Sequence, residues 1–226
     1  MYKLYTNSNR KQTSQYEIPS CFLARKPRHL FKQSPVRSMH FSYSHRMCRS
    51  IAVESQLELD YFFLLEYEGF ADYYEAQPHT FEYLMHGKKR RYTADFIVIT
   101  DSSIQAIEIK YKKETENPLF KLKTKVLTEE LGKHGIEFVV VTDEEIRVGQ
   151  RAQNIRMLMP KLTMPSPLKQ FEHLLTEIPM GKMTVKQLND LLPALKIDTS
   201  FIAKAVAHKL IRADLTLSWP EVILNW

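Results

Sequence analysis

The stretch that decides the fold runs from Tyr92 to Lys110 and reads YTADFIVITDSSIQAIEIK. Two apolar runs separated by a short polar segment predict a β-hairpin. Alternate side chains of a strand lie on one face, so Glu108 and Lys110 should point the same way. Asp95 opens the first strand. The sequence therefore predicts that two acids and one lysine converge across this hairpin.

Such a group of residues suits a divalent metal. Carboxylate and carbonyl oxygens are the ligands that Mg²⁺ takes in proteins, so Asp95, Glu108 and the backbone carbonyl of Ile109 are candidate ligands, with Mn²⁺ as a substitute. The ammonium of Lys110 could orient a water or neutralise a phosphate beside them. The alternative for Glu108 and Lys110 is an exposed cross-strand ion pair.

Charge is distributed unevenly along the 226 residues, whose formal net charge is +6. Residues 1–50 carry ten Lys or Arg against one acid, whereas residues 51–165 carry fifteen against nineteen. A basic leader suits a polyanionic partner, although it could also be a solvated tail. We expect an extended arm over 1–50, with DNA contacts from Arg25, Lys26 and Arg28.

A second basic run, formed by Lys88, Lys89, Arg90 and Arg91, comes shortly before Asp95. It could clamp a phosphate beside the metal site, or it could be a solvated loop. The sequence leaves both interpretations open.

Two features bear on the compartment. The chain has two cysteines without metal-like spacing, which suits a reducing environment. No stretch is long and apolar enough to predict a membrane span, and the start does not resemble a signal peptide. We therefore expect a soluble, intracellular protein.

Helical and strand patterns surround the hairpin. Apolar residues at spacings of three and four predict a helix beginning near Ser50, with Glu58 at the border of its apolar stripe. Glu58 is a candidate third acid, or a solvated helix residue. Asn117-Pro118 predicts the start of a helix that runs to His134 with Leu119, Leu122, Val126 and Leu131 inward. The β-branched run from Glu137 to Thr142 predicts a buried strand.

The proline-containing segment 160–167 is the best candidate for a linker. Beyond it, apolar periodicity predicts three short helices, which begin near Pro167, Thr184 and Asp198, and a strand pair over 210–217. This order is typical of a winged helix-turn-helix. We therefore predict an α/β fold with a mixed sheet flanked by helices, followed by a small winged-helix domain. The predicted domains are a basic arm (1–50), an α/β domain (51–162) and a winged-helix-like domain (163–226).

Several segments in this order resemble the TnsA transposon endonucleases. They are Glu54-Ser55-Gln56-Leu57-Glu58, Gln77-Pro78, Arg90 to Phe96, Glu108-Ile109-Lys110 and Val141 to Ile146. The resemblance covers roughly residues 37–160, and the C-terminal helices match the family's layout. Ala94 stands where the family often has proline.

The resemblance implies that residues 51–162 form a nuclease domain with a restriction-endonuclease-like mixed sheet, the PD-(D/E)xK nuclease fold. It implies Glu58, Asp95, Glu108 and Lys110 as the catalytic set, and Glu58, Asp95, Glu108 and Ile109 at the metal. It implies a Mg²⁺-dependent DNA endonuclease that cuts the 5′ strands at the double-stranded ends of a transposon. The implied partners are a TnsB-like DDE transposase and a TnsC-like AAA+ ATPase. The implied location is the cytoplasm of a prokaryote, at the nucleoid during transposition.

Two other functions remain open: a restriction-type endonuclease that acts alone, and a non-catalytic DNA-binding assembly subunit. The C-terminal domain has a net charge of only +1 over 166–226, which argues against DNA reading as its main task. Its last ten residues form an apolar run with two tryptophans, which either folds back on the core or exposes a docking surface for the ATPase.

Overall fold

The computed structural model describes residues 19–24, 39–77, 79–179 and 181–226. The chain divides into two compact units, residues 1–144 and 145–226. Within the described ranges, no helix combines the length and the apolar character needed to cross a membrane.

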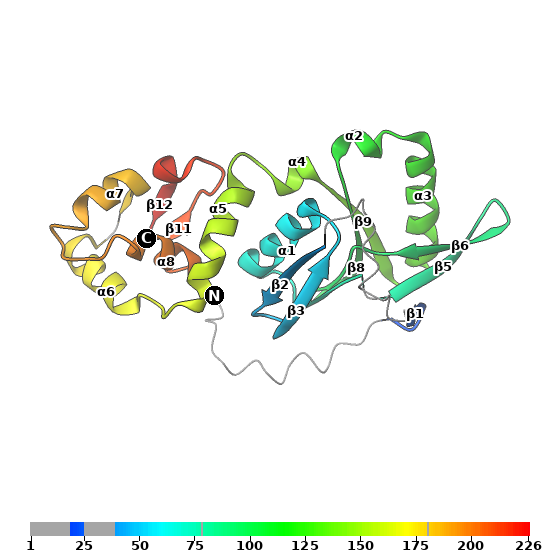
Figure 1. The fold of residues 1–226 in the computed structure, drawn as a ribbon, viewed down its shortest axis with the longest axis horizontal. Helices are drawn as coiled ribbons and strands as arrows, with labels where there is room; N and C mark the ends of the chain where they lie inside the picture. Colours follow the sequence, from blue (N-terminus) through cyan, green and yellow to red (C-terminus); the bar gives the residue numbers. More distant parts are fainter. Residues whose placement is uncertain (1–18, 25–38, 78, 180) are drawn as a thin grey trace. The chain divides into compact units, whose positions relative to one another are not determined.

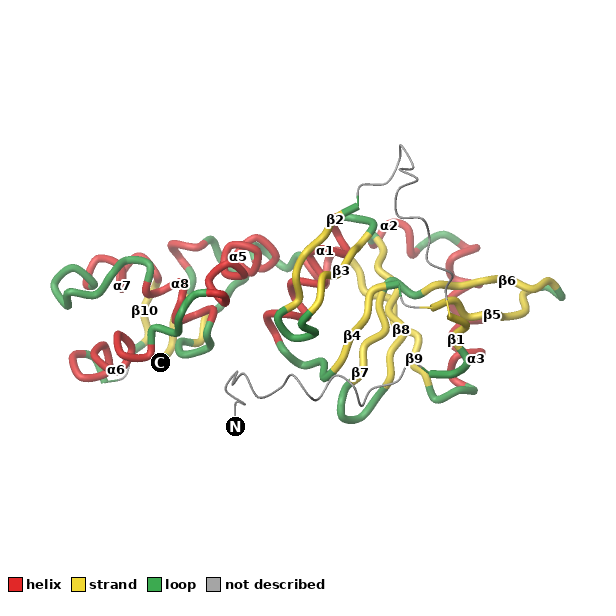
Figure 2. The backbone as a smooth tube through the Cα atoms, turned by 60° about the horizontal axis from the view of Figure 1, so that its bottom comes forward, coloured by secondary structure: helices red, strands yellow, loops and turns green. Residues whose placement is uncertain are grey.

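A four-stranded mixed sheet forms the centre of the first unit (Figures 1 and 2). Its order is β4 (Tyr73–Ala76), β7 (Phe96–Ile99), β8 (Ile104–Lys110) and β9 (Ile136–Thr142). The first two pairings are antiparallel, and β8 pairs with β9 in parallel. The β7–β8 hairpin and the mixed sheet are confirmed, and together with the helices they form the α/β architecture expected of a nuclease-like fold.

The first strand of the hairpin begins directly after Asp95, and the residues before Asp95 belong to a different strand. β6 (Lys88–Thr93) ends before Asp95, and β7 begins after it. β6 pairs with β5 (His79–Met85), which in turn pairs with β1 (Phe22–Ala24) in a separate sheet. The chain changes sheets at Ala94 and Asp95 because Asp95 bonds to β8 through both its main chain and its side chain.

Helix α3 (Pro118–Gly132) connects the parallel strands β8 and β9, as such a pairing requires. Asn117 caps it, accepting a hydrogen bond from the Leu119 main chain. Leu127 and Leu131 are fully buried on its inner face. The prediction that Leu119 points inward is wrong. Its side chain is 71% exposed, because Leu119 lies in the first turn of α3, beyond the buried part of the helix.

Residues 39–53 correct two predictions: the end of the predicted extended arm is a hairpin, and the helix predicted from near Ser50 begins only at Gln56, because the residues before it form a strand. β2 (His40–Ser44) and β3 (Arg49–Val53) form an antiparallel hairpin before helix α1 (Gln56–Glu68). The apolar side chains of Ile51 and Val53 are buried, which outweighs the basic character of the segment. The arm residues Arg25, Lys26 and Arg28 lie outside the described residues.

A buried polar cluster fastens this hairpin to the sheet. The Glu66 carboxylate of α1 accepts hydrogen bonds from Ser44 Oγ at 2.8 Å, from the His45 main chain at 2.9 Å and from the Tyr74 hydroxyl. Glu66 is 1% exposed, and Ser44 and Tyr74 are fully buried. One carboxylate therefore joins β2, α1 and β4.

The second unit contains helices and a three-stranded antiparallel sheet of order β10-β12-β11. The remaining elements of the two units are α2 (Lys112–Thr115), α4 (Asp143–Ile146), α5 (Arg151–Leu158), η3 (Met159–Thr163), α6 (Leu168–Glu177), β10 (Lys182–Thr184), α7 (Val185–Leu191), α8 (Phe201–Ala207), β11 (Arg212–Ala213), η4 (Trp219–Glu221) and β12 (Ile223–Asn225). The three predicted helices correspond to α6, α7 and α8.

Two features of this unit differ from the sequence analysis. The strand pair predicted over 210–217 is wrong, because β11 pairs with the distant β12. Helix α5 and η3, assigned from sequence to the nuclease domain, lie in the second compact unit. Helix α5 is bonded to this unit by its buried Asn154 amide, which donates to the carbonyls of Leu215 and Leu217, each at 2.8 Å.

The apolar tail is part of this fold. β12 is the central strand of the sheet, Val222 and Leu224 are fully buried, and the Trp226 indole donates to the Ile178 carbonyl at 3.1 Å. Of the two interpretations of the tail, folding back is confirmed. Docking of the ATPase on this domain stays a prediction.

The Glu66 cluster yields a stability prediction. Glu66→Ala leaves two buried hydroxyls and one partly buried main-chain N–H without their shared acceptor, so the free energy of unfolding should fall by about 2–4 kcal/mol. Glu68→Ala, at the exposed end of the same helix, is the control and should change it by less than about 0.5 kcal/mol. Chemical denaturation measures both variants, and equal losses would contradict the role of the cluster.

Candidate active site

Asp95 lies between the ends of β4 and β8. Its main-chain N–H donates to Ile107 at 2.9 Å, and its carbonyl accepts from Gln77 at 2.9 Å. Its carboxylate accepts a 2.6 Å hydrogen bond from the Ile109 main chain. These three bonds fix the carboxylate against β8, next to the residues that carry the second acid and the lysine.

Glu108 is 4% exposed, and two lysines neutralise it. Its Oε1 atom lies 3.3 Å from Nζ of Lys110 on the same strand and 3.0 Å from Nζ of Lys123 on α3. Glu108 and Lys110 thus point the same way, as the alternation predicts. The alternative of an exposed cross-strand pair is wrong for Glu108, because its carboxylate is buried under α3.

Burial raises the pKa of Asp95 to about 7, and the nearby Glu108 and Glu58 carboxylates add to the rise. The hydrogen bond from Ile109 and the Lys110 charge oppose it. For Lys110, burial favours the neutral form, but the attraction of Glu108 and Asp95 outweighs it, so the pKa is raised. Lys110 is therefore a cation at neutral pH.

Glu58 lies near this pair and also serves as a helix cap. Its carboxylate accepts from the Glu54 main chain at 2.9 Å, from Ser55 Oγ at 2.8 Å and from the Gln77 amide at 3.5 Å. Glu58 is 8% exposed, so it is not a solvated helix residue. The structure brings it close enough to raise the pKa of Asp95, yet both of its oxygens accept bonds from protein donors.

Sequence reasoning missed Lys123 and the role of Tyr92. The amino group of Lys123 lies 5.0 Å from the centroid of the Tyr92 ring, and burial, followed by the Glu108 and Asp95 charges, raises the pKa of Tyr92 well above its ordinary value. The spacing offered a signal: Lys123 stands four residues before Leu127 and eight before Leu131. A lysine on the buried stripe of a helix needs a buried acid as its partner.

Whether these groups suit a divalent cation depends on their donors. Asp95 and Glu108 offer two hard carboxylates whose mutual repulsion a cation would relieve. The N–H and C=O of one strand residue point to the same side, so the Ile109 carbonyl faces Asp95, as its N–H does. Among the described residues, no three His, Cys, Asp or Glu side chains converge on a common metal position. The fit thus rests on two carboxylates and a carbonyl, with water completing the shell.

The predicted DNA contacts Lys88, Lys89, Arg90 and Arg91 lie on β6 and not in a loop. All four are exposed, and Arg91 pairs with Glu82 across the hairpin at 3.0 Å. Their contact with DNA stays a prediction.

The raised pKa of Asp95 predicts a pH-dependent stability in the metal-free protein. The folded state holds the Asp95 proton up to about pH 7, whereas the ordinary pKa is 3.8. The associated stability is therefore present below about pH 4 and lost as pH rises to 7. Asp95→Asn keeps an acceptor for Ile109 without the charge, so it should become more stable than the wild type by about 1 kcal/mol or more at pH 8.

Urea denaturation in EDTA between pH 4 and pH 8 tests this dependence. Asp101→Asn changes an exposed aspartate of the β7–β8 turn and is the control. A difference between Asp95→Asn and the wild type that stays constant over the range would contradict the prediction.

Comparison with known proteins identifies the central segment. Residues 71–143 match the family model described as TnsA-like endonuclease N terminal. The match includes β4 to β9, and therefore Asp95, Glu108, Lys110 and Lys123. No curated protein matches the chain. The resemblance found in the sequence is confirmed: the chain carries a TnsA-like endonuclease domain.

Proposed function

We propose that this protein is a metal-dependent DNA endonuclease that cuts the 5′ strands at transposon ends, as the TnsA-like subunit of a heteromeric transposase. The observation that carries the proposal is the buried pair of Asp95 and Glu108 beside the protonated Lys110, within the segment that matches the nuclease family. The proposed catalytic set is Glu58, Asp95, Glu108 and Lys110.

Phosphodiester hydrolysis needs an activated water and relief of the charge that develops on the phosphate oxygens. A bound Mg²⁺ or Mn²⁺ would supply Lewis acidity and a water of lowered pKa. Asp95, Glu108 and the Ile109 carbonyl are the proposed ligands. Glu58 bonds the residues at the start of α1, close to Asp95. We assign it a position outside the direct ligands of the metal, because its oxygens already accept protein hydrogen bonds.

Lys110 acts in this proposal as a cation. Its raised pKa, caused by Glu108 and Asp95 against the effect of burial, keeps its proton on at neutral pH. A protonated lysine cannot accept the proton of the attacking water. It can bind a phosphate oxygen or orient the water, both of which stabilise the charge of the transition state.

The family match also supports the proposed assembly. We assign a TnsB-like transposase to the cutting of the opposite strand, a TnsC-like ATPase to regulation, and double-stranded transposon ends as the substrate. For residues 163–226 we propose a winged-helix-like module, since three helices and a three-stranded sheet occur there in the described part of the chain.

Removal of the Asp95 carboxylate should abolish cleavage. We expect Asp95→Ala to lose metal-dependent cutting of the 5′ strand at the element's ends, because it removes a proposed metal ligand. Strand-specific products on a denaturing gel, in the presence of the partner transposase, provide the measurement, and Asp101→Ala is the control. An Asp95→Ala protein that cuts at the wild-type rate would exclude the site.

A second measurement should distinguish the role of Lys110 from that of Asp95. Lys110→Ala removes a cation but no metal ligand, so Mn²⁺ binding should survive while the cleavage rate falls by roughly 10² or more. Calorimetric titration with Mn²⁺ compares the two variants. If Lys110→Ala lost metal binding as completely as Asp95→Ala, Lys110 would have a structural role.

A further inference from the structure

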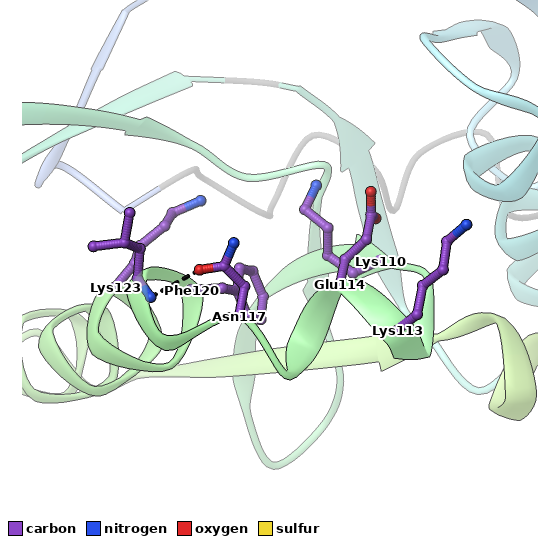
Figure 3. Close-up of a pocket in the computed structure, with 7 residues that line it drawn as sticks. Lys110, Lys113, Glu114, Asn117, Phe120 and Lys123 are labelled. Carbon is purple, nitrogen blue, oxygen red and sulfur yellow. Dashed lines mark hydrogen bonds between the residues drawn. The ribbon is translucent and has the colours of Figure 1, made fainter.

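An open pocket of about 620 Å³ lies where the end of β8 meets α2 and α3. Its polar lining includes Lys110, Lys113, Asn117 and Lys123 (Figure 3). The pocket adjoins the candidate active site, because two of these residues, Lys110 and Lys123, both bind Glu108. In size it falls within the range of small-ligand sites.

The charge of the pocket is positive. Three lysines line it against one acid, Glu114, whose carboxylate is held by a 3.3 Å hydrogen bond from the Tyr111 main chain. Lys110 and Lys123 share one oxygen of Glu108, so a single carboxylate balances two ammonium groups. Lys113 is exposed, with its amino group 5.7 Å from the Tyr111 ring centroid. Such a lining favours an anion.

The same pocket has an apolar part. Phe120 and Leu119 contribute to its lining, and the Leu119 side chain is 71% exposed. The amino group of Lys123 lies 5.9 Å from the centroid of the Phe120 ring. Cations beside an exposed apolar surface suit a ligand with an anionic and an apolar part, and a nucleotide within a DNA strand has both.

We propose that this pocket binds the nucleotide next to the scissile bond on the cleaved DNA strand. Lys113 and Lys123 contact its phosphate, and Phe120 packs against its sugar or base. The assignment rests on the proposed nuclease function, since it extends the same site. It also gives Lys123 two partners: Glu108 in the free protein and the phosphate in the complex.

The first test compares two neighbouring lysines of α2. Lys113 lines the pocket and Lys112 does not, although both are exposed. The full chain in EDTA is titrated into a fluorescein-labelled DNA duplex of arbitrary sequence over a range of salt concentrations. Lys113→Ala should weaken binding and reduce the slope of log K against log salt by about 1, as expected for one lost phosphate contact. Lys112→Ala should leave the slope unchanged.

A second test uses the wild-type chain and needs no variant to fold. Lysine acetylation followed by mass spectrometry, with and without the duplex, should show protection of Lys113 and Lys123 by DNA but none of Lys112 or Lys125. Lys125 is an exposed residue of the same helix as Lys123.

The outcomes separate this proposal from the proposed function. Equal slopes for the two alanine variants, absence of protection at Lys113 and Lys123, or a wild-type chain that does not bind the duplex would each overturn the pocket assignment. Both experiments exclude metal, so they do not depend on cleavage. The expected slopes and protection, together with no cutting of transposon ends in the presence of Mg²⁺ and the partner transposase, would support DNA binding at the pocket and overturn the nuclease function.

Discussion

The desolvation of two neighbouring carboxylates is the constraint on which the rest of this structure depends. Asp95 and Glu108 are held at the centre of a mixed sheet, where an ionised acid is costly. The two carboxylates are stabilised in different ways. Glu108 receives the ammonium groups of Lys110 and Lys123, whereas Asp95 receives a hydrogen bond from Ile109 and has a pKa raised by burial to about 7. A cation bound beside Asp95 would therefore lower the cost of ionising its carboxylate.

Two features of the fold place their groups around this pair of carboxylates. At the change of sheets, Asp95 bonds to β8 twice, with its main chain to Ile107 and with its side chain to Ile109. The parallel pairing of β8 and β9 requires a crossover, and α3 supplies it. Because α3 packs on the sheet through Leu127 and Leu131, its preceding turn on the same stripe places Lys123 over Glu108. A connection that the topology requires therefore also supplies the ammonium group that pairs with Glu108.

How much the sequence predicts depends on how local each signal is. The β7–β8 hairpin, the capped helix α3 and the strand β9 follow from short patterns, and the structure confirms that they form. The predicted burial of β9 is wrong in part, because β9 is an edge strand and its three central valines are only partly buried. The β2–β3 hairpin escapes prediction because its stability comes from Glu66, which lies on a later helix. Likewise the apolar run that ends in Trp226 could belong to the core or to an exposed surface. The pairing of its strand β12 with β10 and β11 shows that it is part of the fold. Lys123 could have been found, since it stands on the apolar stripe of α3.

Glu58 shows why chemical role is harder to predict than position. Ser55 begins α1, and Glu58 occupies the place in its first turn from which a carboxylate caps the helix and interacts favourably with its positive end. That requirement alone would favour an acid there. The same turn lies close enough to Asp95 for the Glu58 charge to raise its pKa. A single glutamate therefore bonds the residues at the start of α1 and also raises the pKa of Asp95.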